Sequence, residues 1–356
     1  MPEAFAPRKE QGGPRPVIIC RDPATRIELA IFASPHLGCA YMPSRRTGPR
    51  IGRNFIPGTA GICVLRDASD IALLLCGHYL RIGIERLVFI DDGSSDGTFE
   101  RLNRLAGRSR GRIEVERTLS EDYRQPELMT MAANGLIEQG FRLIMPFDAD
   151  EFWNLSRADL AALMAHPEPR TIEARWVNFV QRRSRRYPSP FSLGHVRFRS
   201  ADRGRDREIE QAVAEFTDAF VHFHQNKIAI WSEDPIVIDR GQHALRKGPS
   251  ARDPSTFEIL HLPLRAQSEI TKRGLNYEAR RRRVREDAGV SWQSLFHESV
   301  VRADRTAQVW AANSADRKGR LDVYGRPEPL IPDNRLRQAL LAAALHLAIH
   351  YRISPF

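Results

Sequence analysis

The chain has 356 residues, of which 42% are hydrophobic and 28% charged, a composition typical of a soluble globular protein with one large domain or two modest ones. No apolar run approaches the roughly 20 residues that span a bilayer. Residues 1–16 lack the apolar core of a secretory signal, so we expect a cytoplasmic protein.

The net charge is +10, and only five of the 54 basic residues are lysine, which leaves 49 arginines. Arginine binds phosphate and carboxylate through a bidentate fork. The charge therefore suits nucleotides, nucleic acid, anionic glycans or an anionic membrane surface. Nucleotide bias in a genome is the alternative explanation of such a composition. Four cysteines lack C-x-x-C spacing and have apolar neighbours, which predicts free core thiols at Cys20, Cys39, Cys63 and Cys76.

The first part of the chain is rich in Pro and Gly and predicts an N-terminal extension, residues 1–57, with one pair of strands at 17–20 and 28–32. From Gly61 onward, apolar strand-like segments alternate with helical patterns. Ser69 is placed to cap the first of these helices and Gly83 to end it. The predicted strands are 61–65, 86–91, 113–117 and 143–145, and the predicted helices are 69–80, 98–105 and 126–139. This alternation predicts an α/β fold with a doubly wound, mostly parallel sheet.

An acidic segment follows the apolar strand at 143–145, where Asp148, Asp150 and Glu151 come within four residues. Such carboxylates repel each other unless a cation or a solvated rim compensates. Ligands of open α/β sheets collect outside the carboxyl ends of the strands. The segment therefore predicts either a divalent-metal site or an acidic turn after a core strand.

A second acidic segment, DDGSSDGT, begins with Asp91 and Asp92 at the end of another predicted strand. Its Gly and Ser residues allow a tight turn with exposed amides that leads into a helix N-terminus, an arrangement that attracts anions. Two acidic strand ends in one parallel sheet point into the same crevice. This coincidence favours a binding site over two unrelated turns.

The segment VLRDASDIALLLCGHYLRIGIERLVFIDDGSSDGT, followed by FDADEFW, resembles the family 2-like glycosyltransferases of the GT-A fold, in the bacterial branch with a D-A-D-E-F/W motif. The resemblance covers residues 61–153 and extends more loosely to 274. It implies a GT-A-like catalytic domain over 58–264, with a C-terminal helical region over 265–356. It also implies a nucleotide-sugar donor, a glycan or other hydroxyl acceptor, and Mg²⁺ or Mn²⁺. Relatives often carry Asn-Glu in the first loop, where this chain has Asp67-Ala68.

By this resemblance, Asp91 contacts the nucleotide base with Asp92 beside it, and Asp67 lies on the donor side. Asp148 faces the ribose and the metal, and Asp150 is the expected ligand of a cation that bridges the diphosphate. A hard cation there would neutralise the charge of the leaving group.

Three later segments match the family pattern through Lys227, the pair Gly241 and His243, and His261 with Arg265 in H-x-P-x-R. The resemblance implies that these residues line the donor and acceptor crevice, with Lys227 and Arg265 on the donor. A neutral imidazole is a good ligand for Mn²⁺, which makes His261 a candidate metal ligand. Histidines of the core are the alternative for each single position.

An inverting transfer also needs a base near the acceptor hydroxyl. His243, Asp239 and Glu151 are the candidates for catalysis, and Glu151 is alternatively a metal ligand through water or an orienting group. Asp234 and Glu258 compete with them. The spacing does not choose among these residues.

The last segment, from Arg335, predicts a Leu- and Ala-rich helix that docks on the catalytic domain or forms a homo-oligomer with another subunit. Its basic residues lie at its ends, which disfavours a helix in the membrane plane. Peripheral contact with the inner membrane face stays a candidate.

The leading hypothesis is therefore a metal-dependent, inverting glycosyltransferase, with polysaccharide synthesis at the cell surface as a candidate role. A basic nucleic-acid-binding protein is the alternative, although the chain has no compact binding motif and no aromatic residues among its Arg runs, so no nucleic-acid partner is expected. A nucleotidyltransferase would need a Gly-rich phosphate loop where this chain has RDASD. A non-catalytic GT-A-like protein is a further alternative.

Overall fold

The computed structural model describes residues 18–21, 28–31, 55–118, 124–183, 195–201, 207–281 and 292–355. The chain divides into two units, residues 1–47 and 48–356. In the first unit, β1 (Ile18–Arg21) and β2 (Glu28–Ile31) pair antiparallel, which confirms the predicted pair of strands. The domain boundaries after residues 57 and 264 stay predictions.

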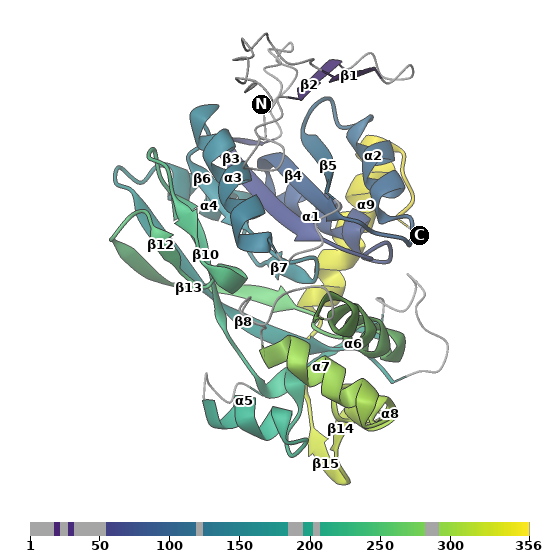
Figure 1. Ribbon diagram of the computed structural model, residues 1–356. Coiled ribbons are helices and arrows are strands. Elements are labelled where there is room, and N and C mark those ends of the chain that lie inside the picture. Colours follow the sequence, from purple (N-terminus) through teal and green to yellow (C-terminus); the bar gives the residue numbers. More distant parts are fainter. Residues whose placement is uncertain are drawn as a thin grey trace, which may run out of the picture. The chain divides into compact units, whose positions relative to one another are not determined.

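The second unit combines one large mixed sheet with helices and two small hairpins (Figure 1). Its strands are β3 (Ile56–Leu65), β4 (Ile84–Asp92), β5 (Ile113–Thr118), β6 (Leu143–Pro146), β7 (Glu151–Trp153), β8 (Arg170–Val180), β9 (Phe198–Arg199), β10 (Asn226–Trp231), β11 (Val237–Ile238), β12 (Leu245–Lys247), β13 (Arg252–His261), β14 (Arg320–Val323), β15 (Arg326–Pro329) and β16 (Ile331–Pro332). Its helices are α1 (Ala72–Ile82), α2 (Thr98–Ala106), α3 (Gln125–Glu138), α4 (Arg157–Met164), α5 (Arg207–Ala214), α6 (Gln267–Arg281), α7 (Trp292–Arg302), α8 (Thr306–Ala312) and α9 (Arg335–Tyr351).

The large sheet has the strand order β16-β9-β8-β10-β6-β3-β4-β5. The pairs β3–β4, β4–β5 and β3–β6 are parallel, and β10 then pairs antiparallel with both β6 and β8. Strand β13 leaves this path, running parallel to β8 and antiparallel to the short β7. The predicted α/β fold is thus confirmed, and the antiparallel strands of its sheet lie in the half that follows β6.

Helices cover both faces of the parallel half. Apolar residues of α1, α2, α4 and α9 pack on one face, with Cys63 and Phe89 of the sheet. Helix α3 packs on the other face, against Ile62 and Ile144. Because successive side chains of a strand point to opposite faces, strands this apolar need a cover on each side.

Helix α1 ends as predicted but begins differently. Gly83 closes it in a left-handed conformation (φ 108°), with its amide donating to the Tyr79 carbonyl. The prediction that Ser69 caps the helix is wrong, because Ile71 is the N-cap residue and no side chain caps it. The amide of Ser69 instead donates to Asp96 Oδ2 at 3.0 Å, since the loop before α1 is bound to the DDGSSDGT loop.

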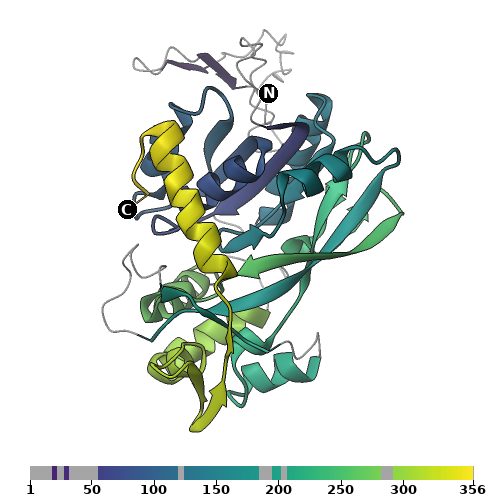
Figure 2. The same cartoon turned by 180° about the vertical axis from the view of Figure 1, so that it is seen from behind.

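The predicted C-terminal helix, α9, docks on α1. Leu336, Leu340, Ala343 and Leu347 are its buried residues. Gly77 of α1 makes the close approach possible, because a Cβ atom there would lie 2.6 Å from the Ala343 carbonyl oxygen. Figure 2 shows α9 running along the outside of the sheet's helical layer.

Within the described ranges, no helix combines the length and the apolarity needed to cross a membrane. Cys63 and Cys76 are buried free thiols, as predicted. The side chains of Cys20 and Cys39 lie outside the described residues.

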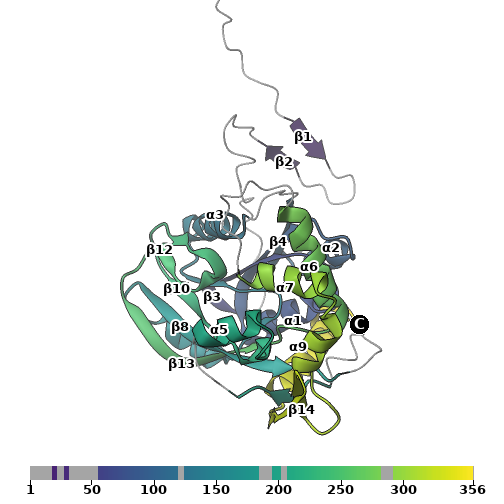
Figure 3. The same cartoon turned by 60° about the horizontal axis from the view of Figure 1, so that its bottom comes forward.

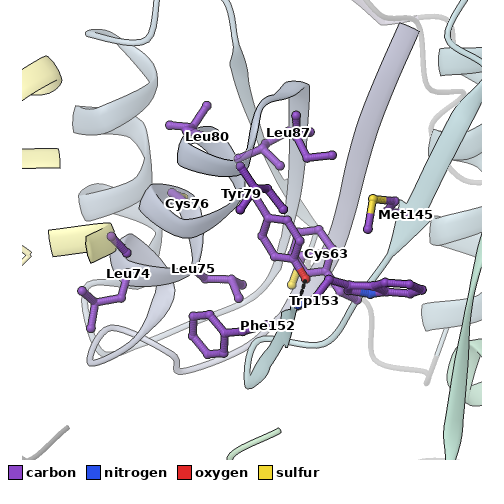
Figure 4. Close-up of a cluster of buried hydrophobic side chains, with 14 of the residues drawn as sticks. Cys63, Leu74, Leu75, Cys76, Tyr79, Leu80, Leu87, Met145, Phe152 and Trp153 are labelled. Atoms are coloured by element: carbon purple, nitrogen blue, oxygen red, sulfur yellow. Dashed lines mark hydrogen bonds between the residues drawn. The ribbon is translucent and has the colours of Figure 1, made fainter. Parts of the chain in front are cut away.

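Two side chains of α1 bind the backbone of β7, the strand that follows the acidic segment. The Tyr79 hydroxyl donates to the Glu151 carbonyl at 3.0 Å and lies 3.5 Å from the Trp153 amide, which it faces in Figure 4. His78 Nε2 donates to the Trp153 carbonyl at 2.9 Å. Burial lowers the pKa of His78 to about 4, because no water solvates the charged ring.

We expect the free energy of unfolding to fall as the pH drops from about 7 to 5, because the unfolded chain protonates His78 near its ordinary pKa while the folded protein keeps it neutral. This stability is present above the unfolded pKa, about 6.5, and is lost as the pH falls toward the folded value. Urea unfolding at the two pH values should show a fall that is smaller by about 2 kcal/mol in His78→Gln. Exposed His195 offers the matched control, His195→Gln, which should keep the full fall. An unchanged fall in His78→Gln would contradict the assignment.

Candidate functional site

The acidic strand ends share one edge of the sheet. The parallel register pairs Leu65 of β3 with Asp91 of β4, and Ile62 of β3 with Pro146 of β6. The carboxyl ends of β3, β4 and β6 therefore lie side by side, followed by the loops that carry the predicted donor and metal residues. The same edge receives the start of β10, because β10 runs antiparallel to β6.

The loops after β3 and β4 bind each other. The Asp67 amide donates to Ser94 Oγ at 2.9 Å, and the Ser95 amide donates to Asp67 Oδ1 at 2.8 Å. Asp67 has a left-handed backbone (φ 49°), a conformation that Asp tolerates better than most residues. The Ser95 amide belongs to the segment whose amides were predicted to be exposed to an anion, and it is engaged within the protein.

Asp91 is fully buried at the end of β4, and its neighbour Asp92 is half-buried. Asp91 Oδ1 accepts from the Ser94 amide at 3.0 Å and lies 3.5 Å from Arg117 Nε. Its other oxygen, Oδ2, is buried without a hydrogen-bond partner among the described residues. A buried carboxylate oxygen without a donor is costly, so this atom has the chemistry to accept a hydrogen bond from a bound group.

Lys227 of β10 lies between two carboxylates and is 1% exposed. Its Nζ donates to Asp148 Oδ2 at 2.7 Å and lies 3.2 Å from Glu151 Oε1. It also donates to Gln242 Oε1 at 2.6 Å. Burial lowers the pKa of Lys227, but the two carboxylates outweigh it and the pKa rises. The ammonium, predicted to bind the donor, thus serves as the internal counter-ion of the acidic segment.

Glu151 is fully buried and both its oxygens are bonded. Oε1 accepts from Trp176 Nε1 at 2.8 Å, and Oε2 accepts from the Asp148 amide at 2.9 Å. Burial raises the pKa of the Glu151 carboxyl, and the charge of Lys227 opposes that rise. With these contacts Glu151 orients Asp148 and Trp176, the role that the sequence analysis left as its alternative.

The oxygens of Asp148 face two side chains. Oδ1 accepts from Gln125 Nε2 at 2.9 Å, and Oδ2 from Lys227. About one third of the Asp148 side chain is exposed (34%), so this carboxylate borders solvent.

Asp150 and His261 face each other. The pairing of β13 with β7 sets His261 opposite Glu151, and His261 Nε2 lies 3.6 Å from Asp150 Oδ1. Arg273 Nη2 of α6 lies 3.4 Å from Asp150 Oδ2. Burial raises the pKa of Asp150, but His261 and then Arg273 outweigh it and hold that pKa well below its usual range. Asp150 is therefore ionised at any physiological pH.

His261 is fixed in one orientation and one tautomer. Its ring stacks on Trp176, with the centroids 4.1 Å apart. Asn178 Nδ2 donates to the carbonyls of Val221 and Phe223, so its Oδ1 points at His261 Nδ1, 2.7 Å away. Nδ1 therefore carries a proton, and Nε2 faces Asp150. Figure 3 shows β8 and β13, which carry these residues, side by side with β10.

Arg265, predicted to bind the donor, forms ion pairs within the protein. Its Nε and Nη2 donate to the two oxygens of Asp70 at 2.7 and 3.2 Å, and Nη2 also pairs with Glu269. The residue is 5% exposed. Burial lowers the pKa of Arg265, but Asp70 and Glu269 outweigh it and the pKa rises. Arg265 thus ties the loop before α1 to α6.

His243 and Asp239 flank the 3-10 turn Arg240–Gln242. His243 Nδ1 donates to the Asn226 carbonyl at 2.5 Å, and the ring borders a cavity of about 40 Å³, too small for a nucleotide. Asp239 Oδ1 accepts from the Arg240 amide and from Arg246 Nε, each at 2.8 Å. The turn also carries Gln242, the residue that reaches Lys227.

The two competing base candidates lie elsewhere. Glu258 pairs with Arg175 at 2.7 Å and also with Arg335. Asp234 is exposed and follows the far end of β10, which lies at the opposite edge of the sheet from Asp148.

The sequence analysis missed several residues of this site. They are Gln125, Trp176, Asn178, Gln242 and Arg273, together with Tyr79 and His78 behind β7. Trp176 and Asn178 do alternate with Ile172 and Ala174 on one face of β8, and all four are buried. Such alternation is typical of a strand with one buried face, and it gives no sign of a site.

Among the described residues, no group of three or more His, Cys, Asp or Glu side chains is arranged to hold a metal ion. Of the predicted metal ligands, Asp150 and His261 face each other.

No family model and no curated protein matches the chain. Among solved structures it is similar to S. aureus TarS 1-349, with 11% identity over 82% of this chain and 88% of that one, at a TM-score of 0.29. It is also similar to HddC from Yersinia pseudotuberculosis, with 7% identity over 36% of this chain and 65% of that one, at a TM-score of 0.27. A putative glucose-1-phosphate thymidylyltransferase from Bacillus anthracis shares 8% identity over 36% of this chain and 61% of its own, at a TM-score of 0.25. The chain spans less than two thirds of the length of the last two.

We expect Lys227→Met to lower the free energy of unfolding by about 3–5 kcal/mol, because it leaves the carboxylates of Asp148 and Glu151 without their buried counter-ion. Urea unfolding measures this loss. The exposed lysine of α6 supplies the control, Lys272→Met, for which a change within about 0.5 kcal/mol is expected. Adding Glu151→Gln to Lys227→Met should restore part of the loss. Equal stability of Lys227→Met and the parent protein would show that the pair is not formed.

Proposed function

We propose that the protein is a metal-dependent glycosyltransferase that transfers a sugar from a nucleotide-sugar to a hydroxyl group, with inversion. The observation that carries the proposal is the pair Asp150 and His261, whose Oδ1 and Nε2 atoms face each other at 3.6 Å. Asp150 lies in the loop after β6, and His261 is the last residue of β13, which pairs with β7. That loop lies at the edge of the sheet where β4 ends with Asp91 and Asp92.

The chemistry of this pair fits a divalent cation. An ionised carboxylate and an imidazole nitrogen that has given up its proton are ligands that Mn²⁺ accepts, and Mg²⁺ binds such carboxylates with phosphate oxygens. Two protein ligands leave positions for oxygens of the donor's diphosphate. A bound cation would neutralise the charge that develops on the diphosphate as it leaves. Arg273, 3.4 Å from Asp150, adds a second positive charge on the same side.

The donor would lie along the loops after β3, β4 and β6. Asp91, whose Oδ2 has no donor among the described residues, suits a polar N–H of the base, and Asp67 holds the neighbouring loop in place. Asp148 would face the ribose, because its partly exposed carboxylate is held by Lys227 and Gln125. Nucleotide binding at this edge follows the general rule for ligands of open α/β sheets.

In the transfer, the acceptor oxygen forms a bond to the anomeric carbon while the bond from that carbon to the diphosphate breaks. The diphosphate keeps the electron pair, and the proton of the acceptor hydroxyl passes to a base of the protein. His243 and Asp239 are the candidate bases, since both flank the turn that holds Gln242 against Lys227. The acceptor we propose is a glycan, as in the synthesis of cell-surface polysaccharides.

Asp150→Asn should abolish metal-dependent binding of the donor, because the neutral amide is a poor ligand for a hard cation. Calorimetry with a panel of UDP- and GDP-sugars, with and without Mn²⁺, measures this, provided that the parent protein binds a member of the panel. Chelation of the metal should reduce the parent's affinity to that of the variant.

The control is Asp304→Asn, at an exposed turn. It should bind the donor as the parent does, and circular dichroism should show both variants folded. Unchanged donor binding by Asp150→Asn in the presence of Mn²⁺ would refute the metal assignment.

Asn178→Ala should weaken Mn²⁺ affinity about 10- to 100-fold, because it releases His261 from its orientation and tautomer without removing a proposed ligand. Titration of Mn²⁺ against the donor-bound protein measures the affinity. Asn154→Ala, at an exposed position, should leave it unchanged. If Asn178→Ala weakens donor binding to the same extent without metal, the role of Asn178 is purely structural.

A further inference from the structure

The outer face of α9 carries apolar side chains that no described residue covers. Leu341, Leu345 and Ile349 recur every four residues and are 48%, 60% and 62% exposed. They lie opposite the residues that pack on α1. A groove of about 540 Å³ continues this surface at the end of the helix, lined by Leu345, Ala348, Ile353 and Pro355 with Arg352 beside them. Contiguous exposed apolar surface of this kind marks an interaction site.

Basic side chains from neighbouring elements lie at the C-terminal end of this apolar face. Arg108, just after α2, donates to the carbonyls of Tyr351 and Arg352. Arg112 donates to the Tyr351 hydroxyl at 3.3 Å. The turn between α2 and β5 therefore supplies basic residues beside α9, whose own basic residues lie at its ends.

Several positive charges of this region have no carboxylate partner among the described residues. Burial lowers the pKa of His346 to about 4, and His350, Arg112 and Arg81 push it in the same direction. None of Arg81, Arg108, Arg112 and Arg352 forms an ion pair with a carboxylate among the described residues. Residues 72–82, 104–112 and 335–351 contain no Asp or Glu, although Glu85 lies near Arg112 and Arg335 pairs with Asp333 and Glu258.

We propose that the outer face of α9 binds a membrane surface that contains anionic lipids. Leu341, Leu345 and Ile349 would enter the boundary between headgroups and acyl chains, and the arginines around them would contact lipid phosphates. A second copy of the chain fits this face less well, because a two-fold contact through α9 would bring two basic clusters together. The proposal does not depend on the proposed transferase activity.

Sedimentation of the full chain with phosphatidylcholine vesicles, with and without phosphatidylglycerol, tests the proposal. We expect binding to the anionic vesicles only, weakening as salt screens the charges. The double variant Leu345→Asp with Ile349→Asp should lower the bound-to-free ratio at least about tenfold, because it removes the apolar contact. Arg104→Glu with Arg110→Glu, at exposed positions of α2 and of the turn after it, should lower the bound-to-free ratio to a similar extent.

The matched control is Leu295→Asp, at a leucine of α7 that is 45% exposed. It should bind anionic vesicles as the parent does, and all variants should show the parent's circular dichroism. Failure of the parent to bind anionic vesicles would overturn the proposal, as would equal binding to neutral ones. A parent dimer in light scattering that Leu345→Asp with Ile349→Asp converts to monomer would assign the face to a second copy instead.

Discussion

The candidate site depends on one buried cation, the ammonium of Lys227. The acidic segment after β6 places Asp148 and Glu151 close together, and Glu151 is fully removed from water. Two carboxylates in such a place would repel each other and lose hydration, so the fold tolerates them only with a counter-ion held between them. Lys227 supplies it from β10, a strand that runs antiparallel to β6 and therefore begins at the same edge.

Some residues around this ion pair hold other side chains in place, and others face the surface of the site. Glu151 binds Trp176, Trp176 stacks on His261, and Asn178 sets the proton of His261. The result is that Nε2 of His261 points at Asp150. Precise placement of this kind, from rigid strands, is what a metal ligand requires, because an imidazole that rotates freely binds a cation weakly.

The sequence predicted the parts of this arrangement that are local. Alternating strands and helices, the glycine that ends α1 and the acidic ends of β4 and β6 are patterns within short segments, and the structure has them. Gln242 could not be predicted, because its contact with Lys227 needs a left-handed backbone (φ 56°) that Gln rarely adopts. Asn178 and His261 meet only because β13 runs between β7 and β8, a pairing that no local pattern reveals. Lys227 and Arg265 were predicted to bind the donor from the family resemblance, which does not show the carboxylates that they pair with in the fold.

The docking of α9 on α1 has a consequence for synthesis of the protein. Arg108, just after α2, donates to the carbonyl of Tyr351 in α9, although the two residues lie 243 positions apart in the sequence. A ribosome needs roughly 10 to 50 s to add that many residues. During this interval the face of α1 around Gly77 lacks α9, the helix that packs on it in the folded protein. That apolar surface therefore stays exposed, and prone to aggregation, until α9 emerges from the ribosome.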